Sequence, residues 1–254
     1  MKFLAELRQR NLLLYWFGWF NFIVGMICFT GLFLDETQLL GVNRWLKPMK
    51  FYLSVGLMIW TMGWLMHYLD DKKKVHRYSW IIVFSMFFEN GLILLQAIRS
   101  TTSHFNNKTA TDSIIFSFMG LFILIFTIVC VLICIEFFRQ KTFSIPASYV
   151  WGIRLGLLFF IIFSIEGGMM LGLSKHTVGA ADGEAGLPLL NWSREYGDLR
   201  IAHFFGLHSL QLLPLAGCYI FRSRNHMILA AMGWFLVISF VFIQALNGRP
   251  LIPA

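Results

Sequence analysis

The chain has 254 residues, of which 57% are hydrophobic, 17% are aromatic and only 13% are charged. Soluble globular proteins average about 25% charged residues, so this composition excludes a water-soluble fold and predicts an integral membrane protein. The net charge of +8 at pH 7 indicates contact with anionic membrane lipids, whereas a nucleic-acid partner does not fit a chain this apolar.

From the N-terminus onward, the sequence contains seven apolar runs near the ~20 residues that a helix needs to cross about 30 Å of hydrocarbon. These runs are residues 12–34, 51–69, 79–98, 113–137, 147–173, 199–221 and 226–246. No Pro/Ser-rich linker divides them. The sequence therefore predicts an all-α polytopic membrane protein, in which residues 1–254 form one domain, a single bundle of seven transmembrane helices.

The connections between these runs differ in basic charge. Those on the side of the N-terminus are short but contain eleven Lys and Arg: 1–11, 70–78, 138–146 and 222–225. Those on the opposite side are longer in total and contain only nine: 35–50, 99–112, 174–200 and 247–254. Basic residues gather in cytoplasmic loops. We therefore expect a multi-pass protein of the cell inner (plasma) membrane with its N-terminus in the cytoplasm and its C-terminus outside.

The fifth outer connection, residues 174–198, is much longer than the others and rich in glycine. Loops of this length inside a compact domain are usually either functional or disordered. Trp192 and the leucines near it argue against a solvated linker. We expect this loop to form a lid or pocket wall, with Trp192 contacting a substrate.

Ionisable side chains inside hydrocarbon cost several kcal/mol, so those within the runs are functional candidates. Glu89 falls near the middle of the third run, with Gln96 two turns further along the same face. Arg99 and His104 follow at the outer mouth. This part of the chain predicts a buried carboxylate with polar and basic groups above it.

Further candidates come from the second and fifth runs. Glu166 falls in the outer half of the fifth run, and Lys47 and Lys50 precede the second run at the outer boundary. A buried carboxylate is protonated at neutral pH unless a cation reaches it. Protonated, it can carry a proton; ionised, it can ligate a metal or act as a general base.

The start of the sixth run is the most polar segment of the apolar part of the chain, and it contains Arg200, His203, His208 and Gln211. His203 and His208 are five positions apart, or about 140° around a helix, so they cannot chelate one ion together. His208 and Gln211 share a face. Each histidine must therefore find partners on a neighbouring helix.

These residues divide into three predicted roles. The predicted catalytic residues are Glu89, Glu166, His203 and His208. The predicted substrate-binding residues are Lys47, Lys50, Gln96, Arg99, Trp192, Arg200 and Gln211. The candidate ligands of a transition metal, zinc or iron, are Glu89, His104, Glu166, His176, His203 and His208. Haem is a further candidate cofactor. Three roles stay open for the histidines: a structural network, a metal or haem ligand, and a proton relay.

Several segments resemble a family of seven-helix bacterial inner-membrane proteins. They are Arg44-Trp-Leu-Lys-Pro-Met-Lys-Phe, Phe88-Glu-Asn-Gly, Ser103-His-Phe-Asn, Gly186-Leu-Pro with Asn191-Trp-Ser, and Asp198-Leu-Arg-Ile-Ala-His-Phe-Phe-Gly-Leu-His. The resemblance covers nearly the whole chain and implies the same seven-helix fold. It implies no established activity, cofactor or site residue.

Two function classes remain open. The first is a metal- or haem-dependent enzyme that acts on a lipid or other apolar small molecule in the outer half of the bundle. The alternative is a proton-coupled transporter, or a ligand-binding or sensor membrane protein. No inverted repeat or pair of broken helices is visible, which counts against transport. We favour the enzyme.

Overall fold

A computed structural model of the protein describes residues 2–183 and 186–252 and contains eight α-helices within them. The chain divides into two compact units, unit 1 (residues 1–136) and unit 2 (residues 137–254). The all-helical class is confirmed. The division concerns compactness within one helical chain, so the single-domain expectation stays a prediction.

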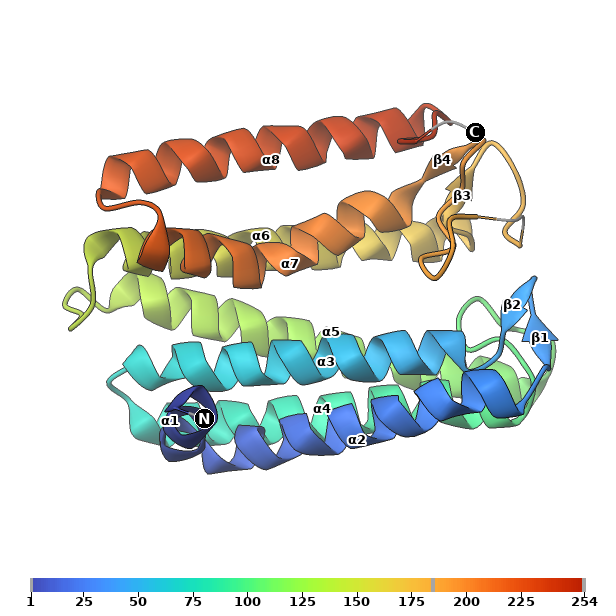
Figure 1. Ribbon diagram of the computed structural model, residues 1–254, viewed down its shortest axis with the longest axis horizontal. Coiled ribbons are helices and arrows are strands. Elements are labelled where there is room, and N and C mark those ends of the chain that lie inside the picture. The colour runs from blue at the N-terminus through green and yellow to red at the C-terminus, as the bar shows by residue number, and fades with distance from the viewer. Residues whose placement is uncertain (1, 184–185, 253–254) are drawn as a thin grey trace. The chain divides into compact units, whose positions relative to one another are not determined.

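Unit 1 contains three long helices, a β-hairpin and most of a fourth long helix (Figure 1). In chain order its elements are α1 (Lys2–Arg10), α2 (Leu12–Leu34), β1 (Gln38–Leu39), β2 (Val42–Asn43), α3 (Leu46–Leu65), the 3₁₀ turn η1 (Met66–Tyr68), α4 (Lys72–Ile98) and α5 (Ala110–Arg139). The main contact is between α2 and α3. It is close because Gly18 of α2 leaves the space that the Trp60 ring of α3 fills.

Unit 2 contains three long helices and a second antiparallel β-hairpin (Figure 1). Its elements are α6 (Ala147–Leu173), β3 (Thr177–Val178), β4 (Gly197–Asp198), α7 (Leu199–Tyr219) and α8 (Arg224–Leu246). Helix α6 packs along α7, and α8 contacts both. The core between them is built from Phe159, Phe163, Leu213, Met227 and Ile238.

Six helices are long and apolar enough to cross a membrane within the described part of the chain: α2, α4, α5, α6, α7 and α8. Their outward faces are covered with exposed apolar side chains, such as Leu236 and Phe240 at 67% and 65% exposure. Patches of this kind on a folded chain mark a surface that contacts lipid. The structure thus supports a multi-pass membrane protein.

Helix α3 differs from its prediction at its beginning. It starts at Leu46 rather than at residue 51, and Lys47 and Lys50 lie in its first two turns. Pro48 does not prevent this start, because the backbone N–H groups of the first helical turn have no partner within the helix. The two lysines therefore belong to the helix and do not precede it.

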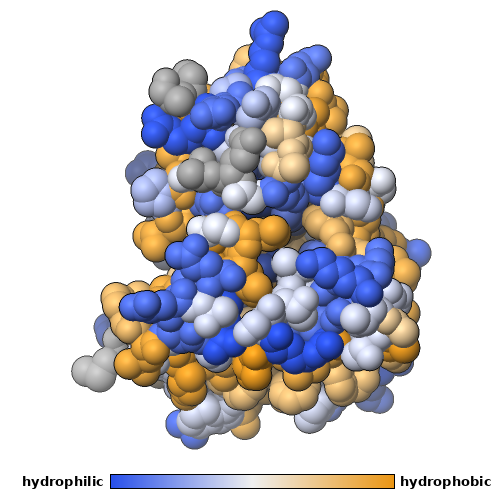
Figure 2. All heavy atoms as spheres, turned by 90° about the vertical axis from the view of Figure 1, so that its right-hand side faces the viewer, coloured by the Kyte–Doolittle hydropathy of each residue, from blue (hydrophilic) through white to orange (hydrophobic). Residues whose placement is uncertain are grey.

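Polar residues gather at the end of each unit that carries its hairpin (Figure 2). In unit 1, the side chain of Arg44 pairs with Asp35, whose carboxylate also accepts hydrogen bonds from Thr37 and Trp45. The hydrogen bonds from Thr37, together with those from Trp45 and Arg44, hold the pKa of Asp35 well below its usual range. The first hairpin is thereby fixed to the start of α3.

Candidate functional site

The closest ionisable pair within a helical core is formed by Glu166 of α6 and His203 of α7, in unit 2. His203 Nδ1 lies 2.7 Å from the backbone oxygen of Phe163 and 3.2 Å from Glu166 Oε2. A backbone oxygen only accepts hydrogen bonds, so Nδ1 carries a hydrogen and donates it. In this geometry His203 gains and loses its titrating proton at Nε2.

Glu166 is buried, with 7% of its surface exposed. Its second oxygen, Oε1, has no hydrogen-bond partner among the described residues. A buried acceptor without a partner costs about 1–3 kcal/mol, and more when it is charged. Protonation of Oε1, or a ligand that donates a hydrogen bond to it, removes this cost. The pair can therefore exchange a proton or bind a hydrogen-bond donor.

Glycines bring α6 and α7 close enough for this pair to form. A Cβ atom at Gly152 of α6 would lie 2.5 Å from the backbone oxygen of Leu213, and one at Gly217 of α7 would collide with the backbone oxygen of Ser148. Small residues at a helix contact allow such backbone approach in membranes. Nearer the pair, a Cβ atom at Gly167 would lie 2.7 Å from the His203 ring.

Arg200, a predicted substrate-binding residue, uses its guanidinium within the protein. Its Nε donates to Asp198 Oδ1 at 2.9 Å, and one terminal nitrogen donates to Asp198 Oδ2 at 2.6 Å and to the backbone oxygen of Asn191 at 2.5 Å. Asp198 also caps the start of α7. Arg200 thus fixes the end of the long loop to α7.

Trp192 is a buried residue of that loop, with 8% of its surface exposed. Its ring centroid lies 5.6 Å from that of Phe204 and 6.2 Å from that of Phe205. These two residues follow His203 on α7. The loop near Trp192 therefore packs on the segment of α7 that carries the candidate pair.

His208 has different neighbours from His203, as their spacing along the helix predicts. Its ring stacks on Phe204 at a centroid distance of 4.2 Å, and its side chain hydrogen-bonds with Gln211. The shared face predicted for His208 and Gln211 is confirmed.

His176 pairs with Asp182 at the start of the long loop, with 2.6 Å between His176 Nδ1 and Asp182 Oδ2. The backbone N–H groups of His176 and Thr177 also donate to this carboxylate. Burial alone would raise the pKa of Asp182, but these hydrogen bonds and the His176 side chain outweigh burial and lower it well below its usual range. This contact orders the loop at a distance along the chain from the Glu166–His203 pair.

A second polar cluster lies within unit 1. Glu89 of α4 is 4% exposed, and its Oε2 has no hydrogen-bond partner among the described residues. Lys47 of α3 is close enough to interact with Glu89 electrostatically. Lys47 Nζ also donates to His104 Nδ1 at 3.0 Å, and Ser103 Oγ lies 3.1 Å from the same nitrogen. Glu89, Lys47 and His104 are thus brought together as the sequence predicts.

Next to this cluster, Gln96 and Arg99 meet a residue that the sequence analysis missed. Asp112 Oδ1 accepts from Gln96 Nε2 at 3.0 Å and from Arg99 at 2.8 Å. Asp112 looked like a flank of the fourth apolar run. The signal that could have found it is the spacing of Thr109 and Asp112, a helix-start pattern in which each side chain bonds near the other.

A buried amide pair between α2 and α4 was also missed. Asn90 Nδ2 donates to Asn21 Oδ1 at 2.8 Å, and both residues are at most 1% exposed. Asn21 donates in turn to the backbone oxygen of Phe17. Neutral amides were not among the ionisable groups that the sequence analysis followed, although asparagine inside an apolar run is itself a signal.

The expected metal site is not supported. Among the residues that the structure describes, no three His, Cys, Asp or Glu side chains gather as a metal ion requires. The six candidate ligands divide between the units: Glu89 and His104 in unit 1, and Glu166, His176, His203 and His208 in unit 2. Within unit 2, His203 faces Glu166, His208 faces Gln211, and His176 faces Asp182. The histidines therefore pair separately.

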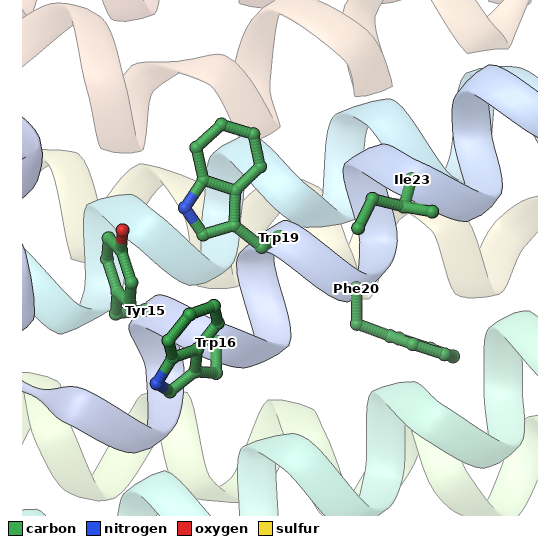
Figure 3. A pocket seen from close by; sticks show the side chains of 5 residues that line it. All are labelled: Tyr15, Trp16, Trp19, Phe20 and Ile23. Carbon is green, nitrogen blue, oxygen red and sulfur yellow. The ribbon is translucent and has the colours of Figure 1, made fainter.

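A surface groove on α2 is lined by Tyr15, Trp16, Trp19, Phe20 and Ile23 (Figure 3). Apart from the tyrosine hydroxyl and the indole N–H groups, its lining is apolar, and it contains no carboxylate or imidazole. An aromatic surface of this kind suits contact with lipid. The groove is not the candidate site.

Arg154, the main basic residue in the inner half of the fifth apolar run, bonds with backbone oxygens at the end of α5. Its guanidinium donates to the oxygens of Phe137 and Gln140 at 2.9 and 3.0 Å. Positive charge is favourable at a helix C-terminus. Glu136, the partner expected for Arg154, pairs instead with Lys74 at 2.8 Å.

Comparisons of this chain with protein-family models, with curated proteins and with solved structures found no match.

Proposed function

We propose that this chain is a seven-span protein of the bacterial inner membrane that couples protonation of the Glu166–His203 pair to the binding of a small ligand, as a transporter or sensor does. The observation that carries the proposal is the pair itself. It is buried between two helices, one histidine nitrogen is held by a backbone oxygen, and Glu166 Oε1 has no partner among the described residues.

The seventh span in this proposal is α3. It has 20 residues, which at 1.5 Å per residue reach about 30 Å, the thickness of the hydrocarbon. Its two charged residues, Lys47 and Lys50, both lie in the first two turns. Long lysine side chains at such a position reach the lipid headgroups. The distribution of basic residues supports an N-terminus in the cytoplasm, with both hairpins on the outer side.

Proton coupling follows from the chemistry of the pair. When His203 is protonated at Nε2, its positive charge favours an ionised Glu166; when His203 is neutral, a protonated Glu166 avoids an unpaired buried charge. A ligand that donates to Oε1 favours the ionised carboxylate. Ligand binding and proton binding at this pair are therefore linked.

The test is infrared difference spectroscopy of the protein in liposomes of phosphatidylethanolamine and phosphatidylglycerol, between about pH 8 and about pH 5. We expect a carboxylic-acid C=O band that changes with pH in the wild type and is absent from Glu166→Gln. Glu195→Gln, in the exposed part of the long loop, is the matched control and should keep the band. A Glu166→Gln protein with the full wild-type difference band would overturn the proposal.

A further inference from the structure

The two units have the same order of elements. Unit 1 contains a helix, two paired strands, a second helix and a third helix: α2, β1, β2, α3 and α4. Unit 2 contains the same succession: α6, β3, β4, α7 and α8. Helix α5 connects the two sets. Such agreement in kind and order indicates a repeat and directs attention to the sequence at equivalent positions.

The second helices of the two sets begin with the same pattern. Counted from the first helical residue, both have leucine at position 1, a basic residue at position 2, lysine or histidine at position 5 and phenylalanine at position 6. The segments are Leu46-Lys-Pro-Met-Lys-Phe51 and Leu199-Arg-Ile-Ala-His-Phe204. Both leading leucines are buried, at 8% and 0% exposure. The likeness is thus in register with the helix start.

The third helices agree in spacing and in capping. Helix α3 begins at Leu46 and α4 at Lys72, while α7 begins at Leu199 and α8 at Arg224, so the two intervals differ by a single position. In each case the side chain that precedes the third helix caps it by accepting a hydrogen bond from the backbone N–H three positions on. Asp71 accepts from Lys74, and Ser223 accepts from His226.

The hairpins agree in register and differ in what they enclose. In the first, the pair Leu39–Val42 closes a tight turn, Leu40-Gly41, in which both residues have positive φ. In the second, the pair Val178–Gly197 closes the much longer segment 179–196. An insertion at the turn accounts for this difference without changing the strand pairing.

We propose that residues 12–98 and 147–246 are two copies of one three-helix repeat, and that residues 179–196 are an insertion in the hairpin turn of the second copy. In this alignment, Lys47 corresponds to Arg200 and Lys50 to His203. The second copy thus has a titratable imidazole where the first has a lysine. The buried carboxylates do not correspond, since Glu89 lies on a third helix and Glu166 on a first.

The repeat deepens the proposed function and, for this step, rests on it. If every long helix crosses the membrane, four helices separate the two hairpins, so both copies have the same orientation. Parallel repeats of this kind are one architecture of secondary transporters. The proton-exchanging pair would then belong to one copy, with a fixed positive charge at the corresponding position of the other.

The first experiment replaces residues 179–196 of the full chain by the Leu-Gly turn of the first hairpin. We expect a monodisperse protein whose melting temperature falls by about 10 °C at most. The control places the same turn one position earlier, in place of residues 178–195, which shifts the strand register. It brings Tyr196 to the position of Gly197, where a side chain would collide with the backbone oxygen of Ala245. The control should aggregate or melt much lower, and equal melting of the two variants would overturn the insertion.

A second measurement decides the repeat if neither variant folds. Single cysteines at Gln38 and Ala181, both exposed and one in each hairpin, are introduced after the four native cysteines are replaced by serine. A membrane-impermeant maleimide should label both from the same face of the membrane, and a cysteine at Lys141 only from the other face. Labelling of Gln38→Cys and Ala181→Cys from opposite faces would overturn the parallel repeat. Neither result depends on protonation of Glu166.

Discussion

The Nδ1 atom of His203 lies 3.2 Å from Oε2 of Glu166, and a glycine makes the space for this contact. Gly167 follows Glu166 on α6, and a Cβ atom there would lie 2.7 Å from the His203 ring. The carboxylate and the ring therefore meet only while residue 167 has no side chain. This relationship makes Gly167 a positioning residue for the proposed proton site.

Gly167→Ala should destabilise the protein and displace the ring of His203. The added methyl group has no room, and overpacking of this kind costs about 1–3 kcal/mol. The measurement is thermal unfolding in detergent, followed by tryptophan fluorescence. Gly168→Ala is the matched control, because a Cβ atom at Gly168 meets nothing within 4 Å. It should be neutral or slightly stabilising, and equal losses in both variants would contradict the prediction.

The contact between His176 and Asp182 predicts a pH dependence of the long loop. The pKa of Asp182 lies below its usual range in the folded protein, so the carboxylate stabilises the loop when ionised. This contribution is complete above about pH 5, decreases below about pH 4 and disappears as the carboxylate is protonated. Hydrogen exchange of the His176 and Thr177 amides in wild type and Asp182→Asn measures it.

At about pH 6, which is above the ordinary range for aspartate, these amides should exchange faster in Asp182→Asn than in the wild type. The difference should shrink as the pH falls below about 4, because the wild-type carboxylate then becomes protonated. Comparing the variants at each pH removes the intrinsic effect of pH on exchange. A difference that stays constant over this range would show that the Asp182 charge does not hold the loop.

The sequence predicts the long helices well because each apolar run is its own signal. The runs 12–34 and 147–173 coincide with α2 and α6. Boundaries fail where polar residues continue a helix: α4 begins at Lys72, well before its apolar run at residue 79, because Asp71 caps a charged first turn. Helix α1 was missed for a similar reason, since charged residues interrupt its few apolar ones.

The candidate site is less predictable, because its contacts depend on how helices pack. Glu166 and His203 are far apart in the chain, and nothing in their local sequence says that they face each other. Their meeting depends on glycines elsewhere along α6 and α7. The repeat escaped the sequence analysis since only residue types at a few positions agree and the long connection 179–196 shifts the second copy.

The close approach of α6 and α7 gives the last prediction. A Cβ atom at Gly152 would lie 2.5 Å from the backbone oxygen of Leu213, and a backbone atom cannot move away by changing a rotamer. Gly152→Ala should therefore force the helices apart and cost about 3 kcal/mol, the upper end for overpacking. Gly172→Ala, on the same helix with nothing within 4 Å of its Cβ position, is the control. Because the Glu166–His203 contact spans these two helices, Gly152→Ala should also weaken the pH-dependent carboxylic-acid band, whereas Gly172→Ala should preserve it. An unchanged melting temperature in Gly152→Ala would show that α6 and α7 do not pack through this glycine.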